Sequence, residues 1–506
     1  MCGIAGIVFY GRQGRVDPHQ LEELRDAQRH RGPDDAGIWI ADHGRAGFAH
    51  RRLSIVDLSP RGHQPMATED GRLQLVFNGE IYNFALLRRE LEARGHLFRS
   101  STDTEVILLG YREWGIEILD RLRGMYAFAL YDTEQRKTLL VRDPLGIKPL
   151  YIADDGGRLV FAAEVQAIRR VIGAGEMDAE GLADYLLWGS IAPPRTLYAE
   201  IRALPPASWM LFSQGGADGP VVYYSPEAEL GRPDTPDPLE AQTLLRNAVA
   251  DSVRHHLVSD VPVGAFLSGG VDSSALVGLI ARIHDGPVRT VTLSFDLPEL
   301  DEGALAAEAA RLYGADHHEV KIGIDEVRER IPDAIRGLDQ PSIDGINTYF
   351  VSEAAVRVGL KVAVSGIGGD ELFGGYGTFS HIPRIRAIHD GLTSMPGANG
   401  LVRVAARVLR HLPRTREWGK LARALEYGGS DPGAYFAERG LFSQHEVRAL
   451  LAPTVREAAD ACDPRDELEA RVRLKDLPPE ERVSALEIRQ YLQAQLLRDS
   501  DATSMR

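Results

Sequence analysis

The stretch Val261–Ser274, VPVGAFLSGGVDSS, decides the fold class of the second half of the chain. A short apolar run that leads into two glycines is typical of a strand ending in a tight turn. The residues after the turn, SSALVGLIARIH, have the composition and length of a helix. A strand, a glycine turn and a helix in this order predict one unit of a parallel α/β sheet, in which ligands bind at the carboxyl ends of the strands.

The same alternation continues along the chain, with VRTVTLSF and KVAVSG as further strands and EGALAAEAARLYG as a further helix. We therefore expect a parallel, doubly wound sheet followed by a helical part from about residue 378 to the end. The sheet domain should begin with a helix, because Asp237 is a suitable N-cap and Pro238 a suitable first helical residue.

The first half has a different pattern, with short apolar runs between turn signals and few helices. GIAGIVF, LQLVFNGEIYNF, MYAFALYD, KTLLVRD and RLVFAAE are predicted strands. This pattern predicts an α+β sandwich. We divide the chain into a sandwich domain over residues 1–212, a linker or interdomain hairpin rich in Gly and Pro over residues 213–236, and a parallel-sheet domain with a helical end over residues 237–506.

The overall composition excludes several functional classes. The chain has 506 residues with 58 basic and 73 acidic side chains, a net charge of −15, so we expect neither nucleic-acid nor anionic-membrane binding. No signal peptide and no apolar stretch of membrane-spanning length is visible in the sequence. Two cysteines cannot form a disulfide framework. We expect a cytoplasmic protein.

The glycine turn after the predicted strand has the chemistry of a phosphate site. Glycines let backbone N–H groups approach an anion, and the following helix directs its positive end to the same place. Ser268, Ser273 and Ser274 can donate hydrogen bonds, and Asp272 can bind Mg²⁺. No Walker loop is present. The alternative interpretation is a glycine-rich turn that binds nothing.

A second glycine cluster, SGIGGDELFGGY over residues 365–376, follows the strand KVAV. In a parallel sheet the two clusters lie on the same edge, so Asp370 is a candidate second Mg²⁺ ligand. The alternative is a loop with an acidic helix cap. The pair His317–His318 is a poor metal candidate, because adjacent strand residues point to opposite faces.

Several motifs of the first half occur in the order typical of class II glutamine amidotransferases. They are Cys2 with GIAGI, His30–Asp34 (HRGPD), Arg52–Val56 (RLSIV), Asn78–Asn83 (NGEIYN) and Thr102–Glu105 (TDTE). The full SGGVDSS is similar to the pyrophosphate loop of ATP pyrophosphatases. Together with SGIGGDELFGGY, these motifs make the chain resemble the glutamine-hydrolysing asparagine synthetase family over nearly its whole length.

For the first half, the resemblance implies an N-terminal-nucleophile glutaminase. Removal of Met1 would make Cys2 N-terminal, and its α-amino group, with a pKa of about 8, would serve as the base. The Asn78 side chain and the Gly79 N–H would stabilise the oxyanion. By the same resemblance, the α-carboxylate of glutamine would meet Arg52, and its α-ammonium would meet Asp103 and Glu80. The implied glutamine site consists of Arg52, Leu53, Ser54, Ile55, Val56, Asn78, Gly79, Glu80 and Asp103.

For the second half, the resemblance implies that ATP and a carboxylate, most simply aspartate, form an acyl-adenylate and pyrophosphate. Ammonia would arrive through an apolar tunnel and give asparagine and AMP. The implied ATP site consists of Leu267, Ser268, Gly269, Gly270, Asp272, Ser273, Ser274, Leu293, Ser365 and Gly366, with Asp272 and Asp370 as Mg²⁺ ligands. A homodimer is a further expectation from the family.

Two features depart from the family pattern. Ile367 stands where the family usually has a glutamate, which favours a related enzyme that amidates another carboxylate, such as a sugar acid or a secondary metabolite. The chain also stops at LLRDSDATSMR, where the family continues. We therefore expect a C-terminally truncated form, and a glutaminase with an inactive synthetase half is a third hypothesis.

Overall fold

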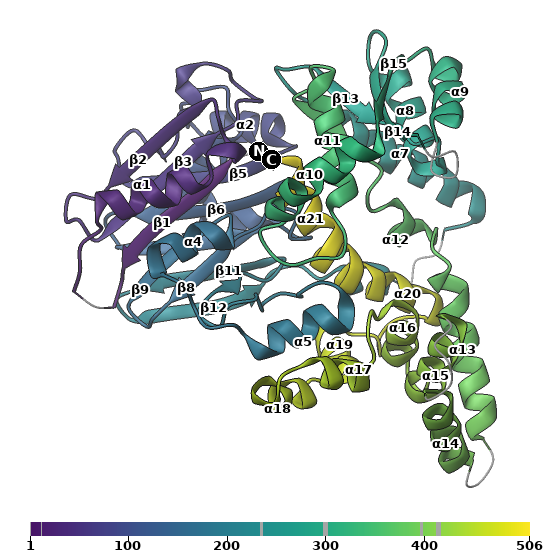
Figure 1. Cartoon of the computed structure of the whole chain (residues 1–506). Helices are drawn as coiled ribbons and strands as arrows, with labels where there is room; N and C mark the ends of the chain where they lie inside the picture. Colours follow the sequence, from purple (N-terminus) through teal and green to yellow (C-terminus); the bar gives the residue numbers. More distant parts are fainter. Residues whose placement is uncertain (1, 12, 233–235, 297–301, 395–397, 411–415) are drawn as a thin grey trace.

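Figure 1 shows the computed structural model of the chain, with the strand-rich first half beside a second half that ends in helices. The structure describes residues 2–11, 13–232, 236–296, 302–394, 398–410 and 416–506. The first half holds two antiparallel six-stranded sheets, and the second half holds a parallel four-stranded sheet. The predicted change from a sandwich of strands to a parallel sheet is therefore confirmed.

The two sheets of the first half pack face to face around a shared core that includes Ile4, Phe48, Val76 and Ala127. The first sheet runs β10 (Arg202–Ala203), β8 (Tyr151–Asp154), β9 (Arg158–Ala162), β1 (Gly3–Phe9), β3 (Ala46–Arg52), β2 (Asp35–Ile40). The second runs β12 (Gly216–Val222), β11 (Ser208–Ser213), β7 (Lys137–Arg142), β6 (Gly124–Asp132), β5 (Leu73–Ile81), β4 (Met66–Ala67). This arrangement places β1 and β5, which carry the predicted catalytic motifs, in facing sheets.

Helices cover the outer faces of this sandwich. Helices α1 (Pro18–Ala27) and α4 (Val165–Ile172) pack on the first sheet, and α2 (Phe84–Ala93) and α3 (Thr104–Trp114) pack on the second. Short 3₁₀ turns are η1 (Arg29–Arg31), η2 (Pro60–Gly62) and η3 (Gly115–Asp120), and α5 (Ala179–Trp188) follows α4. Both sheets thus have one face in the shared core and one face under helices.

The stretch predicted as a linker, residues 213–236, is partly structured. Residues 216–222 form β12, which pairs with β11 at the edge of the second sheet. Helix α6 (Pro226–Leu230) follows, and its Glu227 pairs with Arg489 near the end of the chain at 2.7 Å. Strands β11 and β12 form a hairpin, and this ion pair ties the helix after it to the second half.

The parallel sheet has the order β15 (Asp316–Ile322), β14 (Arg289–Phe295), β13 (Val263–Phe266), β16 (Val362–Val364). Helices α7 (Pro238–His256), α8 (Val271–Ile283) and α9 (Gly303–Tyr313) cover one face, and α10 (Ile324–Gly337) and α11 (Ile346–Arg357) cover the other. The predicted start of α7 is confirmed, because the Asp237 side chain accepts hydrogen bonds from the N–H groups of Leu239 and Glu240.

The remainder of the chain is helical, as predicted. Its elements are α12 (Gly369–Phe373), α13 (Thr378–Thr393), α14 (Ala398–Arg410), α15 (Arg416–Tyr427), α16 (Asp431–Arg439), α17 (Gln444–Leu450), α18 (Pro453–Ala461), α19 (Pro464–Arg471), α20 (Pro479–Leu486), the π-helix η5 (Glu487–Leu496) and α21 (Leu497–Ser504). Figure 1 shows α13–α15 projecting away from the sheets and α21 running back to the first half.

The contact between α21 and the first half is a buried cluster of charges. Asp501 pairs with Lys148 at 3.2 Å and with Arg31, and Arg31 also pairs with Glu164 at 3.3 Å. All four side chains are almost inaccessible to solvent. Removing Asp501 would leave the buried Lys148 without its partner, so this cluster fixes how α21 sits on the first half.

No helix in the described ranges is both long and apolar enough to cross a membrane.

Candidate active sites

Cys2 connects inner strands of the two facing sheets. It directly precedes β1 of the first sheet, and Asn78 and Gly79 belong to β5 of the second. The Cys2 N–H donates to Asn78 Oδ1 at 2.9 Å, and the Cys2 Sγ lies 3.9 Å from the carbonyl oxygen of Leu53. The structure thus brings together the predicted nucleophile and both predicted oxyanion donors.

Asn78 is held so that its amide group remains free to donate. Its side chain is fully buried, its Oδ1 accepts from Cys2, and its Nδ2 has no hydrogen-bond partner in the described part of the chain. A buried N–H without a partner is costly, and such groups in native structures commonly serve a ligand or a reaction. A donor fixed beside a thiol is the arrangement that stabilises a tetrahedral oxyanion.

The Cys2 thiol requires a base. Burial is the largest influence and raises the pKa of the thiol, although the backbone of Leu53 and the charge of Arg52 act in the opposite direction. The thiol is therefore protonated at neutral pH, and the thiolate is the nucleophilic form. Any reaction at Cys2 must include a group that accepts this proton.

Gly79 is required by close packing between strands. A Cβ at this position would lie 2.1 Å from the carbonyl oxygen of Met125 on the neighbouring strand β6. Any larger residue would push β5 away from β6 and displace Asn78. The glycine after Asn78 is thus explained by the sheet itself, in addition to its predicted role as an oxyanion donor.

Arg52 is fixed by the loop that follows β3. Its guanidinium donates to the carbonyl oxygens of Ser59 at 3.0 Å and Val56 at 3.3 Å, and also to that of Asp57. Asp57 has a left-handed backbone with φ of 55°. Because three carbonyl groups of one loop set the position of Arg52, the conformation of residues 53–59 determines where this cation lies.

Two carboxyl groups of this site, Glu80 and Asp103, have raised pKa values. Burial raises the pKa of Glu80 to about 7, and the nearby charge of Asp103 adds to this effect. Burial also raises the pKa of Asp103 to about 6, although the N–H of Ile81 donates to it at 2.9 Å. A bound cation would favour the ionised form of both groups, so Glu80 and Asp103 together suit an ammonium group.

These groups line one small cavity of about 40 Å³. Of the residues implied by the resemblance, Cys2, Arg52, Leu53, Ile55, Val56, Gly79, Glu80 and Asp103 line the cavity. Ser54 and Asn78 do not appear in its lining; Ser54 donates its N–H to Asp34 at 2.7 Å.

The lining also contains residues that the sequence did not indicate, namely Gly62, Gln64, Phe77, Thr102 and Thr104. Gln64 accepts the N–H of Phe77 at 2.7 Å and thereby connects the loop after β3 with β5. The two threonines flank Asp103 in the motif TDTE, so that motif contained the signal for them. Nothing in the sequence around Gln64 indicated its contact with β5.

The predicted phosphate loop is held by hydrogen bonds to its own serine hydroxyls, and the helix that follows it begins without a side-chain cap. Helix α8 begins at Val271 without a side-chain cap, and Val271 is 85% exposed. The Ser268 and Ser273 hydroxyls lie 3.0 Å apart, and Ser273 Oγ also accepts the N–H of Ser268 at 3.2 Å. Gly269 has φ of 77°, and a Cβ there would lie 2.7 Å from Cβ of Leu305. Serine hydroxyls and uncapped N–H groups together can bind an anion.

The two glycine loops meet at Asp272. A Cβ on Gly369 would lie 2.8 Å from Asp272 Cγ, and one on Gly366 would lie 3.2 Å from Asp272 Cβ. Burial, followed by the charge of Asp370, raises the pKa of Asp272. Within the described ranges no cluster of three or more His, Cys, Asp or Glu could hold a metal. Two carboxylates nevertheless fit Mg²⁺, which is commonly held by one or two carboxylates together with substrate phosphates.

The other residues of the predicted ATP site lie on several elements of the second half. Leu267 packs with α7–α9 on one face of the parallel sheet, whereas Leu293 packs with α10 and α11 on the other. Ser274 lies in the first turn of α8, and Ser365 Oγ accepts the N–H of Ile367 at 3.1 Å. Ile367 is 43% exposed. Leu267 and Leu293 therefore do not form one apolar patch.

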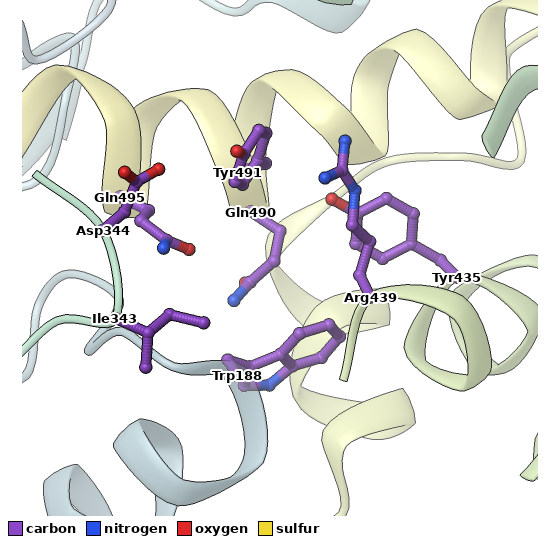
Figure 2. A pocket seen from close by; sticks show the side chains of 8 residues that line it. All are labelled: Trp188, Ile343, Asp344, Tyr435, Arg439, Gln490, Tyr491 and Gln495. Carbon is purple, nitrogen blue, oxygen red and sulfur yellow. The ribbon is translucent and has the colours of Figure 1, made fainter. Parts of the chain in front are cut away.

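A second cavity, of about 200 Å³, lies between the C-terminal helices and the end of α5 (Figure 2). It is lined by Trp188, Ile343, Asp344, Tyr435, Arg439, Gln490, Tyr491 and Gln495. Arg439 is stacked against the rings of Tyr376 and Tyr491, with its guanidinium carbon 4.5 and 4.0 Å from their centres, and pairs with Glu487 at 2.9 Å. Because this cation is already neutralised and Asp344 adds a carboxylate, the cavity is not suited to a polyphosphate.

The fold and the first site define a class of protein. Residues 1–224 match the family model described as a glutamine amidotransferase domain. Residues 244–506, more than half of the chain, match the family model described as asparagine synthase. The chain belongs to the asparagine synthase family, which confirms the resemblance drawn from its motifs.

Named relatives agree with this assignment. Glutamine-hydrolysing asparagine synthetase 1 from Bacillus subtilis is 35% identical over 75% of this chain and 59% of its own length. A putative glutamine-hydrolysing asparagine synthetase from Mycobacterium bovis is 38% identical over 74% of this chain and 60% of its own length. Asparagine synthetase B from Escherichia coli is 34% identical over 77% of this chain and 67% of its own length.

The chain therefore spans about 60% of the length of the first two relatives. Among solved structures, glutamine phosphoribosylpyrophosphate amidotransferase from B. subtilis overlaps with a TM-score of 0.34 at 18% identity, covering 72% of this chain and 81% of that one.

Proposed function

We propose that the chain is a glutamine-dependent, ATP-dependent carbon–nitrogen ligase that makes asparagine from aspartate. One observation carries the proposal, namely the placement of Cys2 against Asn78 in a chain whose second half brings two glycine loops together at Asp272. The proposed division has a glutaminase domain over residues 1–212 and a synthetase domain over residues 237–506, and strand β12 extends the sheet of the first domain beyond residue 212. A homodimer remains an expectation from the family.

In the glutaminase reaction, the Cys2 thiol attacks the side-chain amide carbon of glutamine. The α-amino group of Cys2, free after removal of Met1, accepts the thiol proton and returns it to the departing ammonia. The negative oxygen of the tetrahedral intermediate accepts hydrogen bonds from Asn78 Nδ2 and the Gly79 N–H. Water then hydrolyses the thioester to glutamate and regenerates the thiol. Arg52 orients the α-carboxylate, and Asp103 and Glu80 orient the α-ammonium.

In the synthetase reaction, an oxygen of the aspartate β-carboxylate attacks the α-phosphorus of ATP, and the bond to the β-phosphate breaks. This step gives an acyl-adenylate and pyrophosphate. Ammonia attacks the acyl carbon, loses a proton, and displaces AMP to leave the amide. The serine hydroxyls and N–H groups of the loop 268–274 bind the departing pyrophosphate. Asp272 and Asp370 would hold Mg²⁺, which neutralises phosphate charge.

A second candidate is an amidotransferase that acts on another carboxylate. Ile367 favours it, because an isoleucine on the loop beside Asp272 can neither accept a proton from ammonia nor bind a cation. The discriminating experiment offers a panel of carboxylates and measures AMP and pyrophosphate with glutamine, with ammonium and with neither. Formation of AMP with aspartate supports the first candidate, and formation with another carboxylate alone supports the second. Glutamate release without AMP for any acceptor would contradict both.

A further inference from the structure

The loop that lines the predicted glutamine site has a second side, which faces the other half of the chain. We call residues 53–57 the glutamine-site loop. Its side chains at positions 53, 55 and 56 line the cavity beside Cys2. Its backbone is bound from outside by Asp260. The Asp260 N–H donates to the carbonyl oxygen of Ile55 at 3.0 Å, and the Asp57 N–H donates to Asp260 Oδ2 at 2.7 Å.

Lys361 makes a second contact with the same loop. Its Nζ donates to the carbonyl oxygen of Ser54 at 3.0 Å and pairs with Asp34 Oδ2 at 2.5 Å. Asp34 Oδ2 also accepts the N–H of Ser54 at 2.7 Å. Lys361 and Asp34 are about one-third exposed, so the ion pair adds little stability by itself. Its consequence is geometric, because both backbone polar atoms of Ser54 are fixed.

The two contacts come from residues that precede neighbouring strands of the parallel sheet. Asp260 lies three residues before β13, and Lys361 lies immediately before β16. The two strands are neighbours, with Val263 paired to Val362. Because they are parallel, both contacts come from their amino ends, while the loops that contain Asp272 and Asp370 follow their carboxyl ends. The same two strands therefore connect the glutamine-site loop to the two glycine loops.

The contact with Asp260 also holds the backbone of Asp57 in a left-handed conformation. Asp57 has φ of 55°, a conformation that L-residues with a side chain adopt only when their surroundings impose it. Its carboxylate accepts from Ser59 and Ser101, and its carbonyl accepts from Arg52. Without the carboxylate of Asp260, the Asp57 N–H loses its partner and the residue can relax. Relaxation would move the carbonyl that holds Arg52.

We propose that Asp260 and Lys361 are positioning residues for the glutamine site, so that the second half of the chain sets the conformation of the loop that orients Arg52. The inference rests on the proposed function, because it assumes that Arg52 binds the α-carboxylate of glutamine. Neither residue touches the substrate, and neither takes part in proton transfer.

The test compares Asp260→Ala with Asp260→Asn in the full chain. The alanine variant should raise the KM for glutamine at least fivefold and change kcat for glutamate release less than twofold. The asparagine variant should restore the KM to within twofold of wild type, because its amide oxygen can still accept the Asp57 N–H. Ammonium-dependent AMP formation should be unchanged in both. Lys361→Met should raise the KM in the same direction.

Asp251→Ala is the matched control. Asp251 also crosses between the halves, pairing with Arg123 at 3.0 Å, but it does not contact the glutamine-site loop. Its removal should leave the KM for glutamine within twofold of wild type. Equal KM values for Asp260→Ala and Asp251→Ala would overturn the proposal. If Asp260→Ala fails to fold, Lys361→Met tests the same positioning role, because methionine keeps most of the apolar part of the lysine side chain.

Hydrogen–deuterium exchange separates this inference from the proposed function. A wild-type protein that releases no glutamate from glutamine contradicts the proposed function and leaves the loop contact measurable. In Asp260→Ala, exchange in the peptide over residues 53–59 should become at least tenfold faster, with no change in Asp251→Ala. Unaltered exchange in that peptide would refute the positioning role whatever the activity of the wild type.

Discussion

The site around Cys2 and the site around Asp272 are built in opposite ways. Asn78 and Asp103 are 0% and 7% exposed, and the Cys2 site holds a small cavity lined by strand β5 and by the loops that contain Ile55 and Asp103. The loop at Asp272 is open. Val271 is 85% exposed, and the hydroxyls of Ser268 and Ser273 are hydrogen-bonded to each other. At the first site, the predicted oxyanion donor Asn78 is in place without a ligand. The second site exposes N–H groups and carboxylates, and a charged ligand would provide their partners.

This difference has a physical cause. A tetrahedral oxyanion exists only briefly, so its donors must be in place beforehand, and burial in a sheet sandwich provides that. A nucleotide is large and highly charged, so it can order an exposed loop when it binds. If the two sites are separate in this way, each can be disabled without loss of the other.

Cys2→Ala should have the largest effect. Loss of the nucleophile is expected to lower glutamate release from glutamine by more than about a thousandfold. Ammonium-dependent AMP formation should stay within twofold of wild type, because the second site needs only ammonia. Parallel assays of glutamate and AMP measure both quantities. A comparable fall in the ammonium-dependent reaction would show that the two halves are not separate.

Retention of Met1 should be almost as damaging to glutamate release. With Met1 attached, Cys2 carries an amide in place of the amine proposed as the base, and its thiol pKa is raised by burial. Mass spectrometry of the N-terminus, together with the glutaminase assay, relates processing to activity. Full activity from a chain that still carries Met1 would exclude the amine as the base.

Asp272→Asn is the reciprocal experiment. Removing one of the two carboxylates at the junction of the glycine loops should lower AMP formation at least a hundredfold with glutamine or ammonium. Glutamate release should continue. Circular dichroism checks the fold, and Asp316→Asn, a change in an exposed carboxylate of the same sheet, is the control. Wild-type AMP formation by Asp272→Asn would remove Asp272 from the proposed site.

Asn78→Ala should lower kcat for glutamate release about a hundredfold, because one oxyanion donor is worth about 3 kcal/mol. The KM for glutamine should change little, since the amide donates only after attack. A change confined to the KM would instead make Asn78 a binding residue. A loss in kcat would show that the buried, unpaired Nδ2 of Asn78 serves the reaction.

The sequence was most informative where a local pattern has one structural solution. Apolar strands separated by glycine turns and helices predicted a parallel sheet, and parallel strands necessarily bring the loops at Ser268 and Ser365 to one edge. Asp237 with Pro238 predicted the start of α7. The meeting of Cys2 with Asn78 came from the order of family motifs, since no local pattern places β1 opposite β5.

What the sequence did not indicate depends on contacts between distant residues. Asp260 and Lys361 are single charged residues before strands, and only the tertiary structure places them on the glutamine-site loop. The left-handed conformation of Asp57 and the contact of Gln64 with Phe77 have the same origin. Leu267 and Leu293 pack in clusters on opposite faces of the parallel sheet, which the order of the motifs did not indicate.

A smaller effect on the Cys2 site is expected from pH. Glutamine binding should weaken about tenfold between pH 7 and pH 5, because Asp103, with its pKa near 6, loses the charge that attracts an ammonium group. Calorimetry on Cys2→Ala measures this without interference from the reaction. Asp103→Asn should bind weakly, and only Glu80 should then contribute to the dependence on pH. Tight binding by Asp103→Asn at pH 7 would exclude the proposed contact.

The same pKa values imply a cost in stability. The folded pKa of Asp103 and that of Glu80 lie above their ordinary values, so both groups disfavour the folded state as the pH rises above about 4 and approaches 7. Asp103→Asn removes one ionisation and keeps an oxygen for the Ile81 N–H. It should raise the melting temperature by a few degrees at pH 8 and leave it unchanged at pH 4. A variant that is more stable and binds glutamine less well would show that these buried carboxyls are retained for binding.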